Sequence, residues 1–133
     1  MSQTTTKTVL SRILFVLYIA AICLICFASS DSLPNIRRTL FGLDTDKVIH
    51  FIMFAPFPIL AYLSFDHNTR KKGARILFVV ISLIAGTAVA LMTEALQFYI
   101  PSRTMDIKDF YADIMALGIV SVFVLAIDLT HKR

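Results

Sequence analysis

Residues 76–100 read ILFVVISLIAGTAVALMTEALQFYI, a run of 25 residues in which Glu94 is the one charged side chain. A helix needs roughly 17 to 25 apolar residues to cross a bilayer, so this stretch predicts a membrane span. An ionisable group inside such a span costs roughly 2.5 to 3.5 kcal/mol on insertion scales and by default marks a functional site. Glu94, followed three residues later by Gln97, is therefore the first candidate site residue.

The rest of the chain is apolar as well. Of its 133 residues 57% are apolar, and the mean hydropathy is +0.76, which is too high for an ordinary soluble protein. Three further runs, 9–28, 48–65 and 110–129, each have the length of a span. We therefore expect an all-α membrane protein, a bundle of four transmembrane helices that forms a single domain over residues 1–133. Pro56 and Pro58 should bend the second helix.

The positive charges predict how the bundle is oriented. Eight of the 13 Lys and Arg residues flank one side of the four spans and five flank the other, so the positive-inside rule predicts that both termini are cytoplasmic. The eight are Lys7, Arg12, Arg70, Lys71, Lys72, Arg75, Lys132 and Arg133, and the five are Arg37, Arg38, Lys47, Arg103 and Lys108. These basic residues lie at span ends and form no nucleic-acid-binding motif, so we expect no nucleic acid partner.

This orientation brings polar residues from three stretches of chain to the outer face. Gly86, Ala90, Glu94 and Gln97 share a helical stripe about 80° wide, so Glu94 should point into the bundle. The candidate site residues are Lys47 and His50 in the second span, Glu94 and Gln97 in the third, and Arg103, Asp106, Asp109 and Asp113 from the last connection into the fourth.

Each of these residues also has a purely structural explanation. Asp106 and Asp109 are placed to cap the fourth helix, and Lys47 to anchor the second in the interface. His50 could bond a backbone carbonyl, and Arg103 could be the counter-ion of Glu94. An ion network that satisfies itself and only locks the four helices together is the resulting alternative.

Three short motifs follow one another along the chain: Lys47-x-x-His50-Phe51-x-x-Phe54, Glu94-x-x-Gln97 and Arg103-x-x-Asp106-x-x-Asp109-x-x-x-Asp113. In this order they resemble the VanZ-like family of small bacterial membrane proteins. The resemblance covers 46–118, and only length and hydropathy match in the first span. The family more commonly has Asn at the position of Asp113 and Gly at that of Ala116.

The resemblance implies a multi-pass protein of the bacterial plasma membrane, and the family's namesake is associated with reduced susceptibility to the glycopeptide teicoplanin. We expect an outward-facing polar pocket that binds or acts on an envelope component, such as a lipid headgroup or a lipid-linked wall precursor. In a catalytic version, His50 or Glu94 would be the general base.

In that version Lys47 and Arg103 would hold a phosphate, and the aspartates would hold a divalent cation. No organic cofactor is expected. The partners would be membrane lipids, a wall precursor or another envelope protein. Catalysis, non-catalytic binding and a structural network share this pattern, and the spacing fixes neither a metal geometry nor the oligomeric state.

Overall fold

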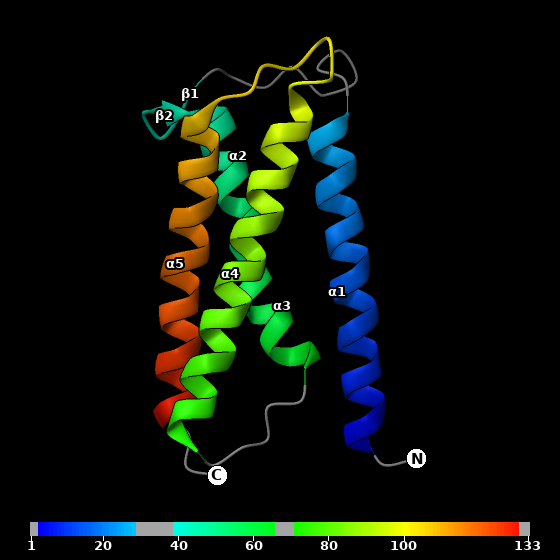
Figure 1. The fold of residues 1–133 in the computed structure, drawn as a ribbon, viewed down its shortest axis with the longest axis vertical. Coiled ribbons are helices and arrows are strands. Elements are labelled where there is room, and N and C mark those ends of the chain that lie inside the picture. Colours follow the sequence, from blue (N-terminus) through cyan, green and yellow to red (C-terminus); the bar gives the residue numbers. More distant parts are fainter. Residues whose placement is uncertain (1–2, 29–38, 66–70, 131–133) are drawn as a thin grey trace.

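The computed structural model describes residues 3–28, 39–65 and 71–130 and consists almost entirely of helix (Figure 1). Its elements are α1 (Gln3–Phe27), β1 (Thr39–Leu40), β2 (Leu43–Asp44), α2 (Thr45–Phe54), α3 (Pro56–Ser64), α4 (Lys72–Gln97) and α5 (Ile107–Thr130). Four segments are long and apolar enough to cross a membrane, and α2 and α3 together form the second of them, Thr45–Ser64. The predicted bundle of four transmembrane helices is therefore confirmed.

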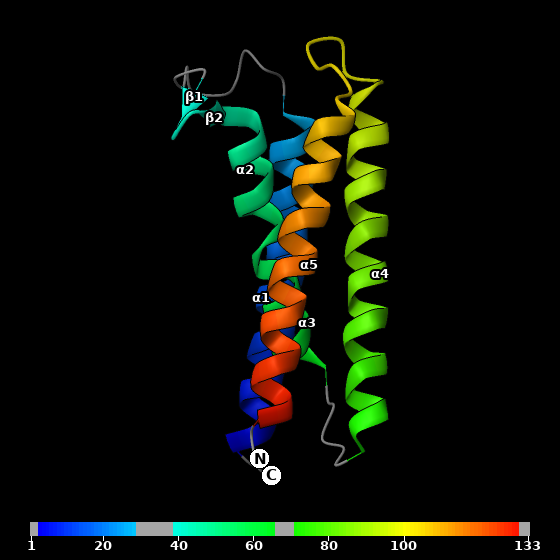
Figure 2. The same cartoon turned by 90° about the vertical axis from the view of Figure 1, so that its left-hand side faces the viewer.

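The four spans run alternately up and down, so helix ends gather at two levels (Figures 1 and 2). At the end that carries the strands, which we call the hairpin end, α1 and α4 finish and α2 and α5 begin. At the opposite end, the terminal end, α1 and α4 begin and α3 and α5 finish. Which end faces the cytoplasm stays a prediction. Five residues counted for it, Arg37, Arg38, Arg70, Lys132 and Arg133, lie outside the described residues.

The second span is divided where the sequence places its prolines. Pro56 and Pro58 have no N–H to donate to the carbonyls of Ile52 and Phe54, so the helical hydrogen-bond pattern is interrupted there. Ala55 keeps helical torsion angles and donates its N–H to Phe51 O at 3.0 Å, so the chain continues in nearly the same direction. The predicted bend thus takes the form of two short helices.

The hairpin ahead of α2 was not expected from the sequence. Thr39 pairs with Asp44 and Leu40 with Leu43, and Phe41 and Gly42 at the turn both have positive φ, 54° and 79°. Two left-handed residues give a turn whose twist suits a two-residue hairpin. The fold is all-α apart from this hairpin, which places Asp44 directly before the first turn of α2.

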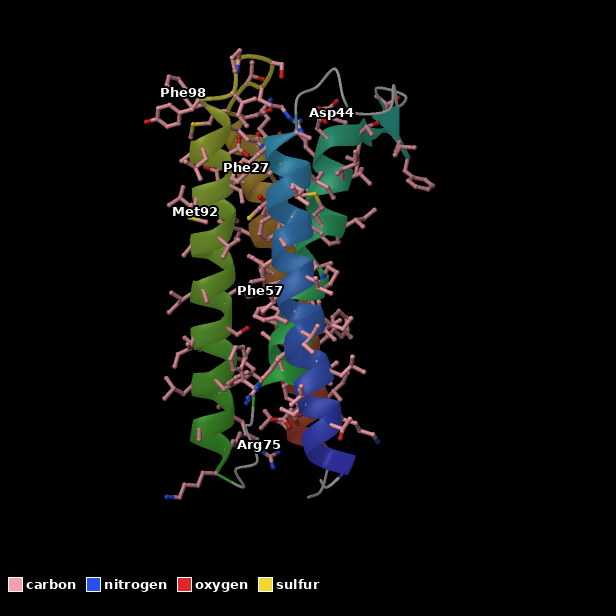
Figure 3. The ribbon with its side chains drawn as sticks, turned by 90° about the vertical axis from the view of Figure 1, so that its right-hand side faces the viewer. Phe27, Asp44, Phe57, Arg75, Met92 and Phe98 are labelled. Atoms are coloured by element: carbon pink, nitrogen blue, oxygen red, sulfur yellow. The ribbon has the colours of Figure 1, made fainter. Side chains whose placement is uncertain are left out.

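The core lies between the helices and takes buried residues from α1, α2, α3, α4 and α5. Ala90, Ala116 and Leu117 are completely buried, and Gly86 allows a close approach, because a Cβ there would lie 2.7 Å from Leu117 Cδ2. Other side chains point outward, as Met92 on α4 and Phe98 directly after it do (Figure 3). Exposed apolar residues of this kind are what a helix in lipid requires.

Candidate functional site

Polar side chains from α2, α4 and the start of α5 meet inside the hairpin end of the bundle. Asp44 marks this end and Arg75 the opposite one (Figure 3). The predicted stripe on α4 is confirmed, since Ala90, Glu94 and Gln97 are buried with at most 2% of their surface exposed. We call the following residues the polar cluster: Lys47, His50, Glu94, Gln97, Asp106, Asp109 and Asp113.

His50 connects α2 with two aspartates of α5. Its Nδ1 lies 3.0 Å from Asp113 Oδ1, and its Nε2 lies 3.9 Å from Asp109 Oδ2. The first distance is a hydrogen bond and the second is not. His50 therefore bonds to a carboxylate rather than to a backbone carbonyl. The arrangement in which Nδ1–H donates to Asp113 leaves the lone pair of Nε2 available.

Glu94 is completely buried, and its two oxygens have different surroundings. Oε1 accepts the backbone N–H of Asp106 at 2.6 Å, which ties the end of α4 to the start of α5. Among the residues that the structure describes, Oε2 has no hydrogen-bond partner. The same holds, within the described ranges, for Gln97 Nε2 and Asp113 Oδ2. Buried polar atoms are normally paired, so these atoms are candidates for contact with a ligand.

Asp106 caps α5, which is the structural role that the sequence allowed. Its Oδ1 accepts the N–H of Lys108 at 2.9 Å. Its other oxygen lies 3.7 Å from Lys47 Nζ, so the cap also belongs to the polar cluster. The Asp109 side chain does not cap the helix in this way. Its Oδ1 lies 3.8 Å from Lys47 Nζ.

Lys47 is therefore more than an interface anchor. Its shortest ion pair, 2.9 Å, is with Asp44, a residue that the sequence analysis did not select. The nearby ammonium group lowers the pKa of the exposed Asp44 carboxyl below its usual value. The spacing Asp44-x-x-Lys47 is the signal that could have identified this pair, because an acid just before a helix and a base three residues later lie close together.

Arg103 is placed apart from the acids. Its Nε donates to Ala28 O at 3.2 Å, and its Nη2 donates to Ile25 O at 3.0 Å, so the guanidinium group binds the carbonyl end of α1. Unpaired carbonyls at a helix C-terminus attract cations. Arg103 thus holds α1 to the bundle. The structure shows no ion pair between Arg103 and Glu94 among the described residues, so Arg103 is not the counter-ion of Glu94 there.

The cluster contains donors that suit a metal ion. One donor atom from each of His50, Glu94 and Asp109 lies within 4.8 Å of the others, and all three side chains are buried. Imidazole nitrogen together with carboxylate oxygen suits divalent transition ions. The same groups could bind the ammonium of a ligand or move a proton, since His50 with Asp113 forms the pair of a base and its orienting acid.

A second polar group, which the sequence analysis did not treat as a site, lies at the terminal end. The Tyr62 hydroxyl donates a hydrogen bond to Asp128 Oδ1 of α5 at 2.6 Å. Asp128 Oδ2 lies 3.7 Å from Arg75 Nε. Arg75 Nη1 also donates to the Asp128 carbonyl at 2.7 Å. We call Tyr62, Arg75 and Asp128 the terminal cluster.

Comparison with known proteins adds one finding. A family model described as VanZ/LLP1 matches residues 14–128, which is most of the chain and includes every member of both clusters. The searches of curated proteins and of solved structures gave no match.

Proposed function

This chain belongs to the VanZ/LLP1 family, and from that premise we propose that it is a multi-pass protein of the bacterial plasma membrane whose polar cluster binds an envelope component. The candidates are a lipid headgroup and a lipid-linked cell-wall precursor. The cluster lies near the hairpin end of the bundle, which in our proposal reaches the level of the lipid headgroups. With the termini in the cytoplasm, as the charges predict, this end faces outward.

One observation supports the proposal most strongly: the buried polar atoms that have no partner. Glu94 Oε2 and Gln97 Nε2 belong to almost completely buried side chains, and no hydrogen bond to either atom occurs within the described ranges. Burial of an unpaired polar atom costs about 1 to 3 kcal/mol. A network that served only to hold helices together would be expected to satisfy these atoms, whereas a binding site keeps such atoms for its ligand.

The charges of the cluster indicate what kind of group it binds. Four carboxylates surround one ammonium and one imidazole, and Arg103 is engaged by carbonyls of α1. The cluster therefore attracts cations. It fits the amine of a headgroup directly, or a phosphate through an intervening cation. This differs from the sequence-based expectation that Lys47 and Arg103 hold the phosphate themselves.

A catalytic role is the second candidate, and the His50–Asp113 hydrogen bond favours it. A histidine oriented by a carboxylate, with its other nitrogen facing the binding site, is a typical general base. Glu94 would then position the substrate or the attacking water. Binder and enzyme share this geometry, so turnover of an isolated envelope lipid by the purified protein separates them.

Native mass spectrometry of the detergent-purified protein tests the binding proposal. The wild type is mixed with envelope lipids extracted from bacteria, and the lipids that it retains are compared with those retained by Glu94→Gln. We expect about a tenfold loss of retained lipid in the variant. Asp46→Asn is the matched control, because it removes an exposed acid of α2. Equal retention by wild type and Glu94→Gln would contradict the proposal.

A further inference from the structure

We propose that His50, Glu94 and Asp109 form a binding site for a divalent transition-metal ion of the Zn²⁺ or Mn²⁺ type, with Asp113 as the residue that orients the histidine. The three donors come from three helices, α2, α4 and α5, and one donor atom of each lies within 4.8 Å of the other two. The inference rests on the proposed function, because the ion would be the cation that links the acidic cluster to a headgroup phosphate.

The histidine is arranged as metal-binding histidines are. In such sites one ring nitrogen binds the ion and the other donates its proton to a carboxylate or carbonyl, which fixes the tautomer and the ring orientation. His50 Nδ1 lies 3.0 Å from Asp113 Oδ1, which provides this bond. His50 Nε2 is then the ligand atom, and it faces Asp109 at 3.9 Å, too far for a direct hydrogen bond.

The carboxylates supply oxygens that nothing else occupies. Glu94 Oε1 is used by the Asp106 N–H, so Oε2 is the oxygen that remains for an ion. Asp109 Oδ1 is also buried and has no hydrogen-bond partner among the described residues, although Lys47 Nζ lies 3.8 Å away. Glu94 is completely buried, and Asp109 as a whole residue is 7% exposed. Two buried carboxylates that lack full compensation are stabilised by a cation.

The distances require a small contraction on binding. Ligands of a tetrahedral Zn²⁺ ion, each about 2.1 Å from the metal, lie about 3.4 Å apart. The three donors, at most 4.8 Å apart, would move inward by rotation of the two carboxylate side chains. Three protein ligands leave at least one coordination position open, and that position is where a phosphate or a water molecule binds.

Metal binding is measured on the purified full chain in detergent, without added lipid. The protein is stripped with a chelator, incubated with Zn²⁺ or with Mn²⁺, desalted and analysed for metal by mass spectrometry, and the affinity is taken from calorimetric titration. We expect one ion per chain for the wild type. His50→Ala, Glu94→Gln and Asp109→Asn should each lose at least 90% of the bound metal.

Three further variants keep the test independent of folding. Asp113→Asn retains all three ligands and should weaken metal affinity by about 10- to 100-fold. Asp46→Asn, an exposed acid on the same helix as His50, should bind like wild type. Helical circular dichroism of each variant must match wild type before its metal content is compared, and a Glu94→Asp variant, which keeps a carboxylate, should retain measurable binding.

The outcomes separate this inference from the proposed function. If the wild type retains no ion, or if the three ligand variants retain as much as the wild type, the metal site is wrong. Lipid retention that depends on Glu94 would then still support the proposed function through an ammonium group of the lipid. Metal bound as expected, with lipid retention equal in wild type and Glu94→Gln, would keep the site and contradict the proposed function.

Discussion

The two polar groups at opposite ends of the bundle both contain buried charged side chains, but they differ in how acids and bases are matched among the described residues. In the terminal cluster, as the described residues define it, the Asp128 carboxylate faces the Arg75 guanidinium group, and the Tyr62 hydroxyl donates to the same carboxylate. In the polar cluster four carboxylates face one ammonium and one imidazole, and Glu94, Gln97, Asp109 and Asp113 each have a buried atom without a hydrogen-bond partner in the described part of the chain. Both ends contain buried charge, so the feature on which we base the proposed site is the excess of acids and of unpaired atoms in the polar cluster.

This difference predicts opposite results for stability and function at the two ends. The terminal cluster should contribute to the fold and be dispensable for ligand binding. The polar cluster should contribute little to the fold, or even destabilise it, and determine binding. The free energy of unfolding in detergent and a functional measurement distinguish the two ends.

The largest effect is expected at the terminal cluster. Arg75→Met removes the guanidinium group that faces the Asp128 carboxylate, which is 2% exposed, and loss of one partner of a buried ion pair costs about 3 to 5 kcal/mol. Replacing both residues, Arg75→Met with Asp128→Leu, should recover most of that loss. Thermal unfolding of the single and double variants measures the difference. A single variant as stable as wild type would remove the structural role assigned to this end.

Gly86 lies between the two clusters and provides a reference for packing alone. In Gly86→Ala the new Cβ lies 2.7 Å from Leu117 Cδ2 and 3.0 Å from Phe57 Cδ1, and overpacking of this kind costs about 1 to 3 kcal/mol. Gly118→Ala is the control, since no atom lies within 4 Å of its Cβ position. Unfolding measurements should show the loss only for Gly86→Ala. Equal stability of the two variants would mean that α4 and α5 are farther apart than described.

At the polar cluster, Glu94→Gln should change the free energy of unfolding by less than about 1 kcal/mol, because it removes a charge that is not compensated and keeps the shape. The functional effect should be large. If the chain shares the role of the family's namesake, its expression should reduce teicoplanin susceptibility, and Glu94→Gln, His50→Ala and Asp106→Asn should abolish that change at equal membrane levels. Unchanged drug response in all three variants would argue against a functional polar cluster.

The smallest effect concerns Asp44 and Lys47 at the exposed rim. Because Lys47 lowers the pKa of Asp44, the pair stabilises the fold above the unfolded-state pKa of the carboxyl, and this contribution disappears as pH falls through the lowered value. Lys47→Met should raise the pKa of Asp44 toward its ordinary value, which an NMR titration of the carboxyl carbon measures. High salt should shift the wild-type value in the same direction. An Asp44 pKa that is insensitive to both changes would show that the pair does not form in solution.

The four spans and the buried polar face of α4 could be predicted from sequence, because they depend on apolar length and helical phase. Apolar length gave four spans, and helical phase placed Ala90, Glu94 and Gln97 on one buried face. The sequence could not predict which side chains pair across helices. His50 could equally have met Glu94, and Arg103 was expected near the acids until the end of α1 proved to lie beside it. Such pairings depend on side-chain rotamers and on the rotation of each helix about its own axis. The pattern of apolar residues along a span determines neither of them.

The hairpin was missed for a different reason. Phe41-Gly42 is a weak turn signal, because an aromatic residue rarely adopts a positive φ and the strands on either side are only two residues long. The terminal cluster was missed because Arg75 was counted among the flanking positive charges and Asp128 lies close to the end of its span. Arg75 and Asp128 are 53 positions apart in the sequence, so their contact can be recognised only from the packing of α4 against α5.

The first helix is attached to the bundle by core side chains such as Ile22 and Cys26 and also through its backbone carbonyls. Arg103 binds the carbonyls of Ile25 and Ala28, and Ser64 Oγ donates to Ser11 O. A main-chain carbonyl is present at every position regardless of the amino acid. The outward-facing residues of α1 can therefore be replaced by other lipid-compatible residues during evolution. The number of helical turns between the Ser11 carbonyl and the carbonyls of Ile25 and Ala28 must be kept.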